Sequence, residues 1–424
     1  MTLKKKGYRP RIIDSKIKRY LRIFGAISIE GPKWCGKTWT ALSHANTVRY
    51  IMNPSSGIDY KETARTEPAL LLEGEEPILI DEWQEVLSIW DAVRFEVDQS
   101  SKRGRFLLTG STKPLDSEIG HSGAGRIARI RMRPMTLFES GRSTGNISFA
   151  DVLTGKEIEP SSNELGLMDL IEMVCRGGWP ANLDLSPEDS LEIPRQYIET
   201  LSRTEITQID GVKRDPEKVK KLLRSFARNT ATIVSNATIL KDLQESDDSL
   251  ARNTIASYVS ALLRLYAIEE IPGWDPEIRS RARIRTSPKR ILADPSLAVA
   301  ALGIGPESLK YDLKTFGFLF ENLCIRDLVT YTDNLDGSVY YYHDSNNTEA
   351  DVVIETKDGN WSAFEIKLGE HRIEEGVSSL FKMKRKVEAD GGKPPVSLCV
   401  ITGGGLACRR DDGIYVIPIN SLAP

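Results

Sequence analysis

The sequence predicts an α/β protein in three parts: an α/β domain with a parallel sheet over residues 1–150, a helical and winged-helix region over 151–309, and a second α/β domain over 310–424. Three observations support this division. Short apolar runs alternate with helix-compatible segments before residue 140, which is typical of a sheet with helices on both faces. Gly, Ser, Pro and Asn then accumulate over 141–165, where we place the first boundary. Helical periodicity follows up to about residue 300, and alternating strands follow from 310 onward.

The first domain begins with a helix over 12–24, because apolar residues recur there at helical intervals, and the strand-like run AISIEG follows it. Residues 78–81 (ILID) and 106–111 (FLLTGS) are continuous apolar runs that end in acidic or small polar residues, as buried parallel strands do. Residues 85–98 lie between these two strands and are compatible with a helix. We therefore expect β and α elements in alternation.

The middle region has its strongest helical candidates at 194–209, 216–234 and 250–267. Within 252–274 a helix with one apolar face is followed by short apolar and polar alternation, which is typical of a winged helix-turn-helix. The C-terminal part should hold helices over 317–330 and 373–388 and strands over 338–343, 349–355, 361–367 and 396–401.

Composition excludes some classes of protein. The 424 residues include 57 Lys+Arg and 60 Asp+Glu, a formal net charge of −3, so the chain lacks the overall basic charge of histone-like binders while a local basic surface stays open. No apolar run approaches the ~20 residues of a membrane helix, and no apolar signal core follows the basic N-terminus, so we expect a cytoplasmic protein. Its five cysteines lack C-x-x-C spacing and are interpreted as reduced thiols.

The strongest motif fits the P-loop pattern G-x-x-x-x-G-K-[ST], with a predicted strand before it and a helix after it. Its residues are Gly31, Pro32, Lys33, Trp34, Cys35, Gly36, Lys37 and Thr38. Such a loop aims backbone N–H groups at phosphate oxygens. Lys37 is then expected to reach the β- and γ-phosphates, and Thr38 to bind Mg²⁺. A glycine-rich turn that happens to contain lysine is the alternative, and the full spacing disfavours it.

An acid pair closes the 78–81 strand. Asp81 is positioned to hold Mg²⁺, and Glu82 to act as the base that polarises the attacking water. At the end of the next strand Ser111, or as a second choice Thr112, would sense the γ-phosphate, although such residues also cap helices and turns. Arg126 is a candidate charge-stabilising finger or sensor, in its own chain or in a neighbouring subunit of a homo-oligomer. The period-two arginines after it, Arg129, Arg131 and Arg133, favour a solvated edge strand.

These segments resemble a known family, the prokaryotic AAA-family P-loop ATPases that carry a C-terminal domain of unknown function. The resemblance rests on E-G-P-K-W-C-G-K-T, I-L-I-D-E-W-Q, L-T-G-S-T, R-M-R-P-M-T-L-F-E-S, R-G-G-W-P at 176–180 and S-P-K-R-I-L-A-D-P at 287–295, which together span nearly the whole chain. It implies ATP as the nucleotide, a linking winged-helix region, an AAA-like first domain and a C-terminal fold similar to restriction endonucleases.

The C-terminal part also contains a D…E-x-K pattern. Asp351 opens one predicted strand, and Glu365 and Lys367 lie on one face at the end of the next. In a metal-dependent nuclease the two acids would hold Mg²⁺, and the lysine would orient a water and stabilise charge. Glu321, on the preceding helix, resembles the additional acid of the PD-(D/E)XK nuclease superfamily. Charged residues on a half-exposed strand give the same pattern, so a nuclease-like fold that only binds a partner stays open.

Two basic clusters could track a DNA or RNA backbone, or form ordinary solvated helix faces. They are Lys213, Arg214, Lys218, Lys220, Lys221, Arg224 and Arg228, and then Arg279, Arg281, Arg283, Arg285, Lys289 and Arg290. The winged-helix prediction favours nucleic acid, since its second helix would enter a major groove, but such modules also dock proteins. Three functions remain: an ATP-driven nuclease, an ATPase switch that binds nucleic acid without cutting, and a regulator with a protein partner.

Overall fold

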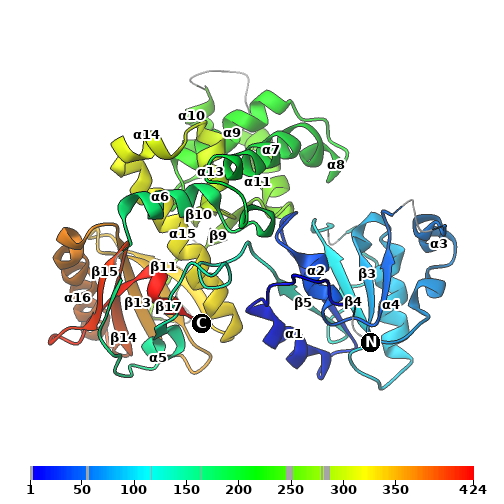
Figure 1. Ribbon diagram of the computed structural model, residues 1–424, viewed down its shortest axis with the longest axis horizontal. Helices are drawn as coiled ribbons and strands as arrows, with labels where there is room; N and C mark the ends of the chain where they lie inside the picture. Colours follow the sequence, from blue (N-terminus) through cyan, green and yellow to red (C-terminus); the bar gives the residue numbers. More distant parts are fainter. Residues whose placement is uncertain are drawn as a thin grey trace. The chain divides into compact units, whose positions relative to one another are not determined.

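The computed structural model describes residues 3–53, 57–115, 117–163, 165–244, 252–277, 280 and 287–424. These residues form two compact units, of which the first contains one sheet and the second contains several (Figure 1). The first unit comprises Met1–Pro134 with two short later segments, Gln208–Val212 and Ala261–Ala267. The second comprises the rest of the chain. Among the helices of the described ranges, none has the length and apolar character required to cross a membrane.

The first unit is a five-stranded sheet in the order β2-β3-β4-β1-β5, and every neighbouring pair is parallel. The strands are β1 (Ala26–Glu30), β2 (Thr47–Tyr50), β3 (Ile78–Asp81), β4 (Phe106–Gly110) and β5 (Ile127–Arg131). The helices are α1 (Ile13–Leu21), α2 (Lys37–Leu42), α3 (Tyr60–Thr66) and α4 (Ser88–Asp98), with 3₁₀ turns at Pro68–Leu72 and Trp83–Glu85. This confirms the predicted alternation of strands and helices.

Side-chain alternation along the strands explains why both faces of this sheet are covered. Ile27 and Leu107 point to one face and pack with α1 and α2. Ile80 and Leu108 point to the other face and pack with α4 and the 3₁₀ turns. Strands buried on both faces need continuous apolar runs, which is how ILID and FLLTG could be recognised. As predicted, the strand that carries Arg129 and Arg131 lies at an edge of the sheet, but β5 ends at Arg131 and does not include Arg133.

The helical part of the second unit differs in detail from the prediction. The helix expected over 194–209 is divided into α7 (Glu192–Thr200), a π-helical turn (Leu201–Glu205) and α8 (Ile206–Gln208). The helix expected over 216–234 ends earlier, as α9 (Pro216–Arg228), and a short strand follows it. Other helices are α5 (Phe149–Leu153), α6 (Leu167–Arg176), α10 (Asn236–Gln244), α11 (Arg252–Arg264), α13 (Pro295–Leu302) and α14 (Pro306–Tyr311), with 3₁₀ turns at Pro180–Asn182 and Asp189–Leu191.

Three short strands form an antiparallel sheet among these helices, in the order β8-β10-β9. They are β8 (Thr232–Ile233), β9 (Ile268–Ile271) and β10 (Lys289–Leu292). Along the chain the order is α9, β8, α10, α11, β9 and β10. All four residues of β10 are buried, which fixes this strand in the interior of the second unit.

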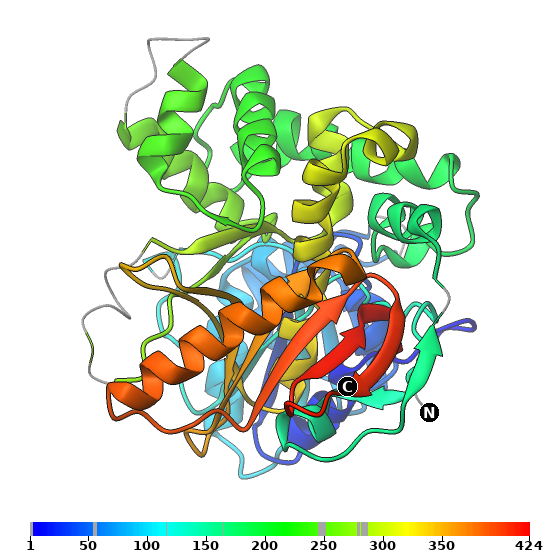
Figure 2. The ribbon, with the colours of Figure 1, turned by 90° about the vertical axis from the view of Figure 1, so that its left-hand side faces the viewer.

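The second unit also contains a seven-stranded mixed sheet in the order β11-β12-β13-β14-β16-β15-β7. Its C-terminal strands are β11 (Ser338–His343), β12 (Glu349–Glu355), β13 (Trp361–Lys367), β14 (Ser397–Thr402), β15 (Gly405–Arg409) and β16 (Tyr415–Pro418). The first four match the predicted strands. Helix α16 (Ile373–Ala389) lies across one face of the sheet (Figure 2). Its Leu380 and Met383 belong to the core beneath it. The long helix α15 (Leu313–Asn334) precedes β11.

The segment 141–165, where the composition predicts a boundary, contains β6 (Ile147–Ser148) and β7 (Ser161–Asn163). Strand β7 pairs with β15, and β6 pairs with β17 (Leu422–Ala423), so this segment belongs to the second unit. Its few apolar residues explain the placement, since Ile147 and Phe149 are buried. The boundaries predicted near 150 and 310 stay predictions.

Candidate functional site

The P-loop connects β1 to α2 in the first unit. Two of its glycines are required by the backbone: Gly36 has φ +102°, a left-handed conformation that favours glycine, and a Cβ on Gly31 would lie 2.1 Å from the carbonyl oxygen of Met132. Trp34 also has a positive φ, at 63°. The sequence therefore forms a tightly curled loop whose backbone can approach a ligand closely.

Lys37 and Thr38 begin α2 and take different partners. The Lys37 ammonium donates to the carbonyl of Pro32 at 2.9 Å, within the loop itself, and is buried. The Thr38 hydroxyl donates to Asp81 Oδ1 at 2.7 Å. A hydroxyl of this strand–loop–helix motif thus already faces the acid at the end of β3.

Asp81 is held by hydroxyl groups. Besides Thr38, the hydroxyl of Thr109 on β4 donates to Asp81 Oδ1 at 2.6 Å, because Asp81 and Thr109 are register partners in neighbouring strands. Burial raises the pKa of Asp81, against the effect of these two hydrogen bonds. Within the described ranges no group of three or more His, Cys, Asp or Glu residues is arranged to hold a metal. One carboxylate plus a hydroxyl is nevertheless a donor set that suits Mg²⁺, which is usually held by one or two carboxylates together with phosphates and water.

Glu82 follows Asp81 in a left-handed backbone conformation, with φ 59°. Its carboxylate accepts hydrogen bonds from the Ser111 hydroxyl at 2.8 Å and from the Ser111 backbone N–H at 3.3 Å. The side-chain amide of Gln84 donates to the same oxygen. The structure thus joins two predicted residues, Glu82 and Ser111, at the ends of adjacent strands. Thr112, the second choice, follows Ser111 and is half-buried.

Arg11 is a residue that the sequence analysis missed. Its buried guanidinium donates to the Cys35 carbonyl at 2.7 Å and to the Arg133 carbonyl at 2.8 Å. It therefore connects the P-loop to the segment that follows β5. In the sequence it is one of several basic residues near the N-terminus, and no local pattern distinguishes it from its solvated neighbours.

Tyr266 was also missed. It belongs to the short segment Ala261–Ala267 that joins the first unit, and its hydroxyl donates to Glu30 Oε2 at 2.8 Å, at the end of β1. The guanidinium carbon of Arg131 lies 3.8 Å from the centre of its ring. Burial and the neighbouring Glu30 raise the pKa of Tyr266, so it stays a hydroxyl donor. A segment far along the chain therefore completes the surroundings of the P-loop strand.

Arg126 requires a correction. Its carbonyl accepts from the N–H of Ala26, the first residue of β1, and its guanidinium pairs with Asp98 at 2.7 Å. The P-loop follows the opposite end of β1, about 13 Å away at ~3.3 Å per residue. A role for Arg126 toward a nucleotide bound in its own chain does not fit this position. The hypothesis of a finger acting on a neighbouring subunit stays a prediction.

The second unit brings the four predicted C-terminal residues together. Glu321 lies on α15, Asp351 on β12, and Glu365 and Lys367 at the end of β13. Lys367 Nζ lies 2.5 Å from Glu365 Oε2, and the Ile366 N–H donates to Asp351 Oδ2 at 2.8 Å. Of the four, Glu321, Asp351 and Lys367 border a pocket of about 820 Å³ that also reaches Arg372. The convergence predicted from the D…E-x-K spacing is present.

A lysine that was not assigned to this cluster lies inside it. Lys289 Nζ on β10 is 2.7 Å from Glu321 Oε1, 3.2 Å from the Asp351 carbonyl oxygen and 3.5 Å from Asp351 Oδ1. The prediction that Glu321, Asp351 and Glu365 hold a metal does not fit this arrangement, because a buried ammonium group lies between the first two acids.

The electrostatics of this cluster follow from its charge count and burial. Burial, reinforced by the charge of Asp351, raises the pKa of Glu321 to about 7 and that of Glu365 to about 8. For Lys289 and Lys367 burial acts in the opposite direction, but the surrounding carboxylates outweigh it and raise both pKa values. Three acids thus share two permanent ammonium charges, and the excess negative charge favours a bound proton.

The structure divides the two predicted basic clusters into buried and exposed residues. Arg214 is buried and donates to the Ile206 carbonyl and the Ser257 hydroxyl, and Arg290 is buried against Glu270 and Asn236. With Lys289, these residues are internal partners and not surface cations. Lys213, Lys221, Arg224 and Arg228 are exposed, as a solvated or nucleic-acid-binding face requires. Four predicted arginines lie outside the described residues: Arg279, Arg281, Arg283 and Arg285.

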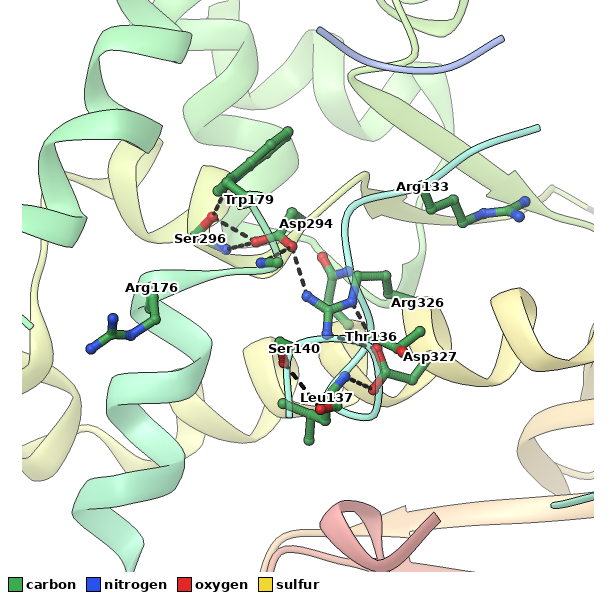
Figure 3. Close-up of polar contacts among 12 residues, drawn as sticks. Arg133, Thr136, Leu137, Ser140, Arg176, Trp179, Asp294, Ser296, Arg326 and Asp327 are labelled. Atoms are coloured by element: carbon green, nitrogen blue, oxygen red, sulfur yellow. Dashed lines mark hydrogen bonds and ion pairs between the residues drawn. The ribbon is translucent and has the colours of Figure 1, made fainter. Parts of the chain in front are cut away.

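Parts of three motif segments that carry the family resemblance meet at the buried Arg326 on α15 (Figure 3). Its guanidinium donates to Asp294 Oδ2 and to Asp327 Oδ1, each at 2.7 Å. Asp294 also accepts the N–H of Gly178, and Asp327 accepts the N–H of Leu137 at 2.8 Å. These unusual residues are thereby explained as a structural network that ties 135–140, 176–180 and 287–295 to one helix.

Comparison with known proteins adds family-level information. Residues 24–140 match the model of an AAA domain, and residues 167–308 and 316–422 match two domains of unknown function, DUF8612 and DUF4143. Two curated relatives are the uncharacterized proteins Mb2031c of Mycobacterium bovis and Rv2008c of Mycobacterium tuberculosis. Each is 23% identical over 357 residues, which are 83% of this chain and 72% of the relative.

Two solved structures are also similar. The Walker-type ATPase paby2304 of Pyrococcus abyssi is 12% identical with a TM-score of 0.41, and the match covers 71% of this chain and 97% of that one. The signal transduction ATPase with numerous domains PH0952 of Pyrococcus horikoshii is 12% identical with a TM-score of 0.23, over 78% of this chain and 49% of that one. Together with the parallel sheet and the P-loop, the AAA-domain match supports an AAA-type ATPase.

Proposed function

We propose that the first unit binds and hydrolyses ATP, with Mg²⁺ as its cofactor. The observation that carries this proposal is the chain of contacts from Thr38 through Asp81 to Thr109, directly beside the P-loop. Mg²⁺ would neutralise phosphate charge there when bound. Thr38 and Asp81 would hold it, and the Lys37 ammonium would exchange the Pro32 carbonyl for phosphate oxygens.

Glu82 is the proposed base that orients the attacking water. Its contacts with Ser111 support this role, because a hydroxyl and a backbone N–H fix the carboxylate at the end of β3. In this proposal Ser111 senses the γ-phosphate through its hydrogen bonds to Glu82. Loss of the γ-phosphate would change the position of Glu82 and, through Ser111, the end of β4. Ser111→Ala is expected to lower kcat more than it raises KM, since it misplaces the base without removing a phosphate contact.

The first experiment measures ATP turnover in Lys37→Ala. We expect turnover to be lost and the fold to be retained, as judged by circular dichroism. Lys102→Ala is the matched control, because Lys102 is an exposed lysine of the same unit, far from the P-loop in the sequence. Turnover in Lys37→Ala at the level of this control would refute the assignment.

The second unit is proposed to be the region that ATP hydrolysis switches. Its element order α9-β8-α10-α11-β9-β10, with a three-stranded antiparallel sheet, supports a winged helix. The mixed sheet with α15 and α16 and the convergence of Glu321, Asp351 and Glu365 support a nuclease-like fold. Both features suit association with DNA or RNA, and α11 presents exposed Arg252 and Asn253 to such a partner.

Two roles of that unit are tested in one assay: ATP hydrolysis with and without duplex DNA or RNA, with strand cleavage followed in the same tube. A cutting enzyme gives Mg²⁺-dependent cleavage that Asp351→Ala abolishes. A switch that binds without cutting gives salt-sensitive binding and no cleavage, and the position of Lys289 favours this second role. A regulator with a protein partner gives neither binding nor cleavage. Arg252→Ala should weaken nucleic-acid binding but leave basal ATP turnover unchanged.

A further inference from the structure

The ammonium of Lys289 has the surroundings of a bound cation. Three oxygen atoms of two residues face it, namely Glu321 Oε1, Asp351 Oδ1 and the Asp351 carbonyl oxygen, at 2.7, 3.5 and 3.2 Å. The ring of Tyr341 lies on a further side, with its centre 6.0 Å away. Carboxylate and carbonyl oxygens are the donors that a divalent ion uses, so lysine and metal would compete for one position.

Backbone pairing fixes this lysine in place. Lys289 opens β10 and pairs with Ile233 of β8 and Ile271 of β9, so both neighbouring strands restrict it. Lys289 is 6% exposed, and its side chain extends from the three-stranded sheet to acids on α15 and β12. The contact therefore depends on two separate sheets and is not the chance position of a surface side chain.

We propose that Lys289 is a built-in cation that occupies the divalent-metal position of the C-terminal acid cluster, so that the intact chain does not bind a divalent ion there. This inference deepens the proposed non-cutting role of the second unit and rests on the nuclease-like arrangement proposed above. A second positive charge would meet the ammonium at a few ångströms in a poorly hydrated site, where like charges repel strongly.

The remaining members of the cluster agree with this proposal. Lys367 already pairs with Glu365, which is 1% exposed, so the third acid is also compensated from within the protein. A pocket of about 820 Å³ is bordered by Glu321, Asp351 and Lys367, and Lys289 is not among the residues that line it. A ligand in that pocket would meet acids whose negative charge is largely offset by Lys289 and Lys367. It would not meet the metal that phosphodiester hydrolysis through these acids requires.

The test is a titration of the full-length, nucleotide-free protein with Mn²⁺, followed by electron paramagnetic resonance. The variants are Lys289→Ala, Lys289→Gln and, as the site control, Glu321→Gln. In the wild type we expect no Mn²⁺ site that Glu321→Gln removes. In Lys289→Ala we expect Mn²⁺ affinity to rise at least about tenfold, the lower end of what one neighbouring charge does to the proton affinity of a carboxylate. Adding Glu321→Gln to that variant should remove the gain.

If the alanine variant fails to fold, Lys289→Gln still tests the proposal. Its neutral amide removes the positive charge but can still donate a hydrogen bond to Glu321. Mn²⁺ bound to the wild type and lost in Glu321→Gln would overturn the proposal, as would a folded Lys289→Gln variant without a gain in affinity. The proposed function fails differently: loss of the nuclease-like role would appear as absent nucleic-acid binding in the wild type, whatever the Mn²⁺ result. Cleavage by the wild type without a Mn²⁺ site at Glu321 would refute the nuclease-like role of the cluster but not the position of Lys289.

Discussion

The two acid clusters of this molecule use similar residues in opposite ways. In the first unit, Asp81 is held by the hydroxyls of Thr38 and Thr109, and the nearby Lys37 is engaged with a carbonyl oxygen. In the second unit, Lys289 compensates Glu321 and Asp351, and Lys367 compensates Glu365. A carboxylate held by neutral hydroxyls is not paired with a counter-charge and can attract an incoming cation, whereas the charge of a carboxylate paired with ammonium is already compensated. The donor to the carboxylate is therefore more informative about metal binding than the carboxylate itself.

The largest expected effect is the loss of unfolding free energy in Lys289→Ala, compared with the small loss in Lys37→Ala. Lys289→Ala leaves Glu321 and Asp351 buried without their counter-charge, which should cost about 3–5 kcal/mol of unfolding free energy. Lys37→Ala removes one hydrogen bond to Pro32 and should cost only about 1 kcal/mol. Denaturant unfolding of both variants measures the difference. Equal losses of unfolding free energy would show that the two lysines have the same structural role. They would contradict the difference between the two acid clusters.

A matched pair of acid variants examines activity. Asp81→Asn should reduce ATP turnover by about 10²–10³-fold, the size of losing one group that stabilises charge in the transition state. Asp351→Asn makes the same chemical change in the other cluster and should leave turnover unchanged. Steady-state ATP hydrolysis at saturating Mg²⁺ provides the comparison. If Asp351→Asn lowers turnover as much as Asp81→Asn, the two clusters are coupled and cannot be treated separately.

The smallest expected effect is a pH dependence. The pKa values of Glu321 and Glu365 are raised to about 7 and about 8 in the folded state, so the folded chain binds more protons than the unfolded chain above pH 5. Stability contributed by these groups is fully present below the ordinary glutamate pKa of 4.5 and is lost as pH rises through the folded-state values of about 7 and about 8. Denaturant unfolding between pH 5 and 8 should show this slope. Glu365→Gln should reduce it, and an unchanged slope would contradict the assignment.

Local pattern explains what could be predicted from the sequence. Strands β3 and β4 could be predicted because strands buried on both faces must be apolar throughout. The P-loop could be predicted because its conformation requires glycine at fixed spacing. The acids Asp351 and Glu365 were placed together because strand side chains alternate and neighbouring strands pair. Each of these arguments uses residues close in the chain or a regular repeat.

The residues that escaped prediction are isolated in the sequence. Lys289 contacts acids 32 and 62 positions later, Tyr266 contacts an acid 236 positions earlier, and Arg11 contacts backbone carbonyls of two separate segments. A single lysine or arginine gives no local sign of whether it will be solvated or buried. That is why Lys289, Arg290 and Arg214 were first grouped with surface cations.

The origin of the Lys289 contact has a practical consequence for dissecting the chain. The ammonium group belongs to Lys289 on β10, and its carboxylate partners Glu321 and Asp351 come after the start of α15 at Leu313. A fragment that begins near residue 310 therefore contains both acids without their lysine. We expect the acid cluster of such a fragment to bind a divalent cation that chelators remove, which the proposal excludes for the same cluster in the intact protein. A covalently tethered cation cannot be dialysed away, and only an experiment on the whole chain reports the true ionic needs of this cluster.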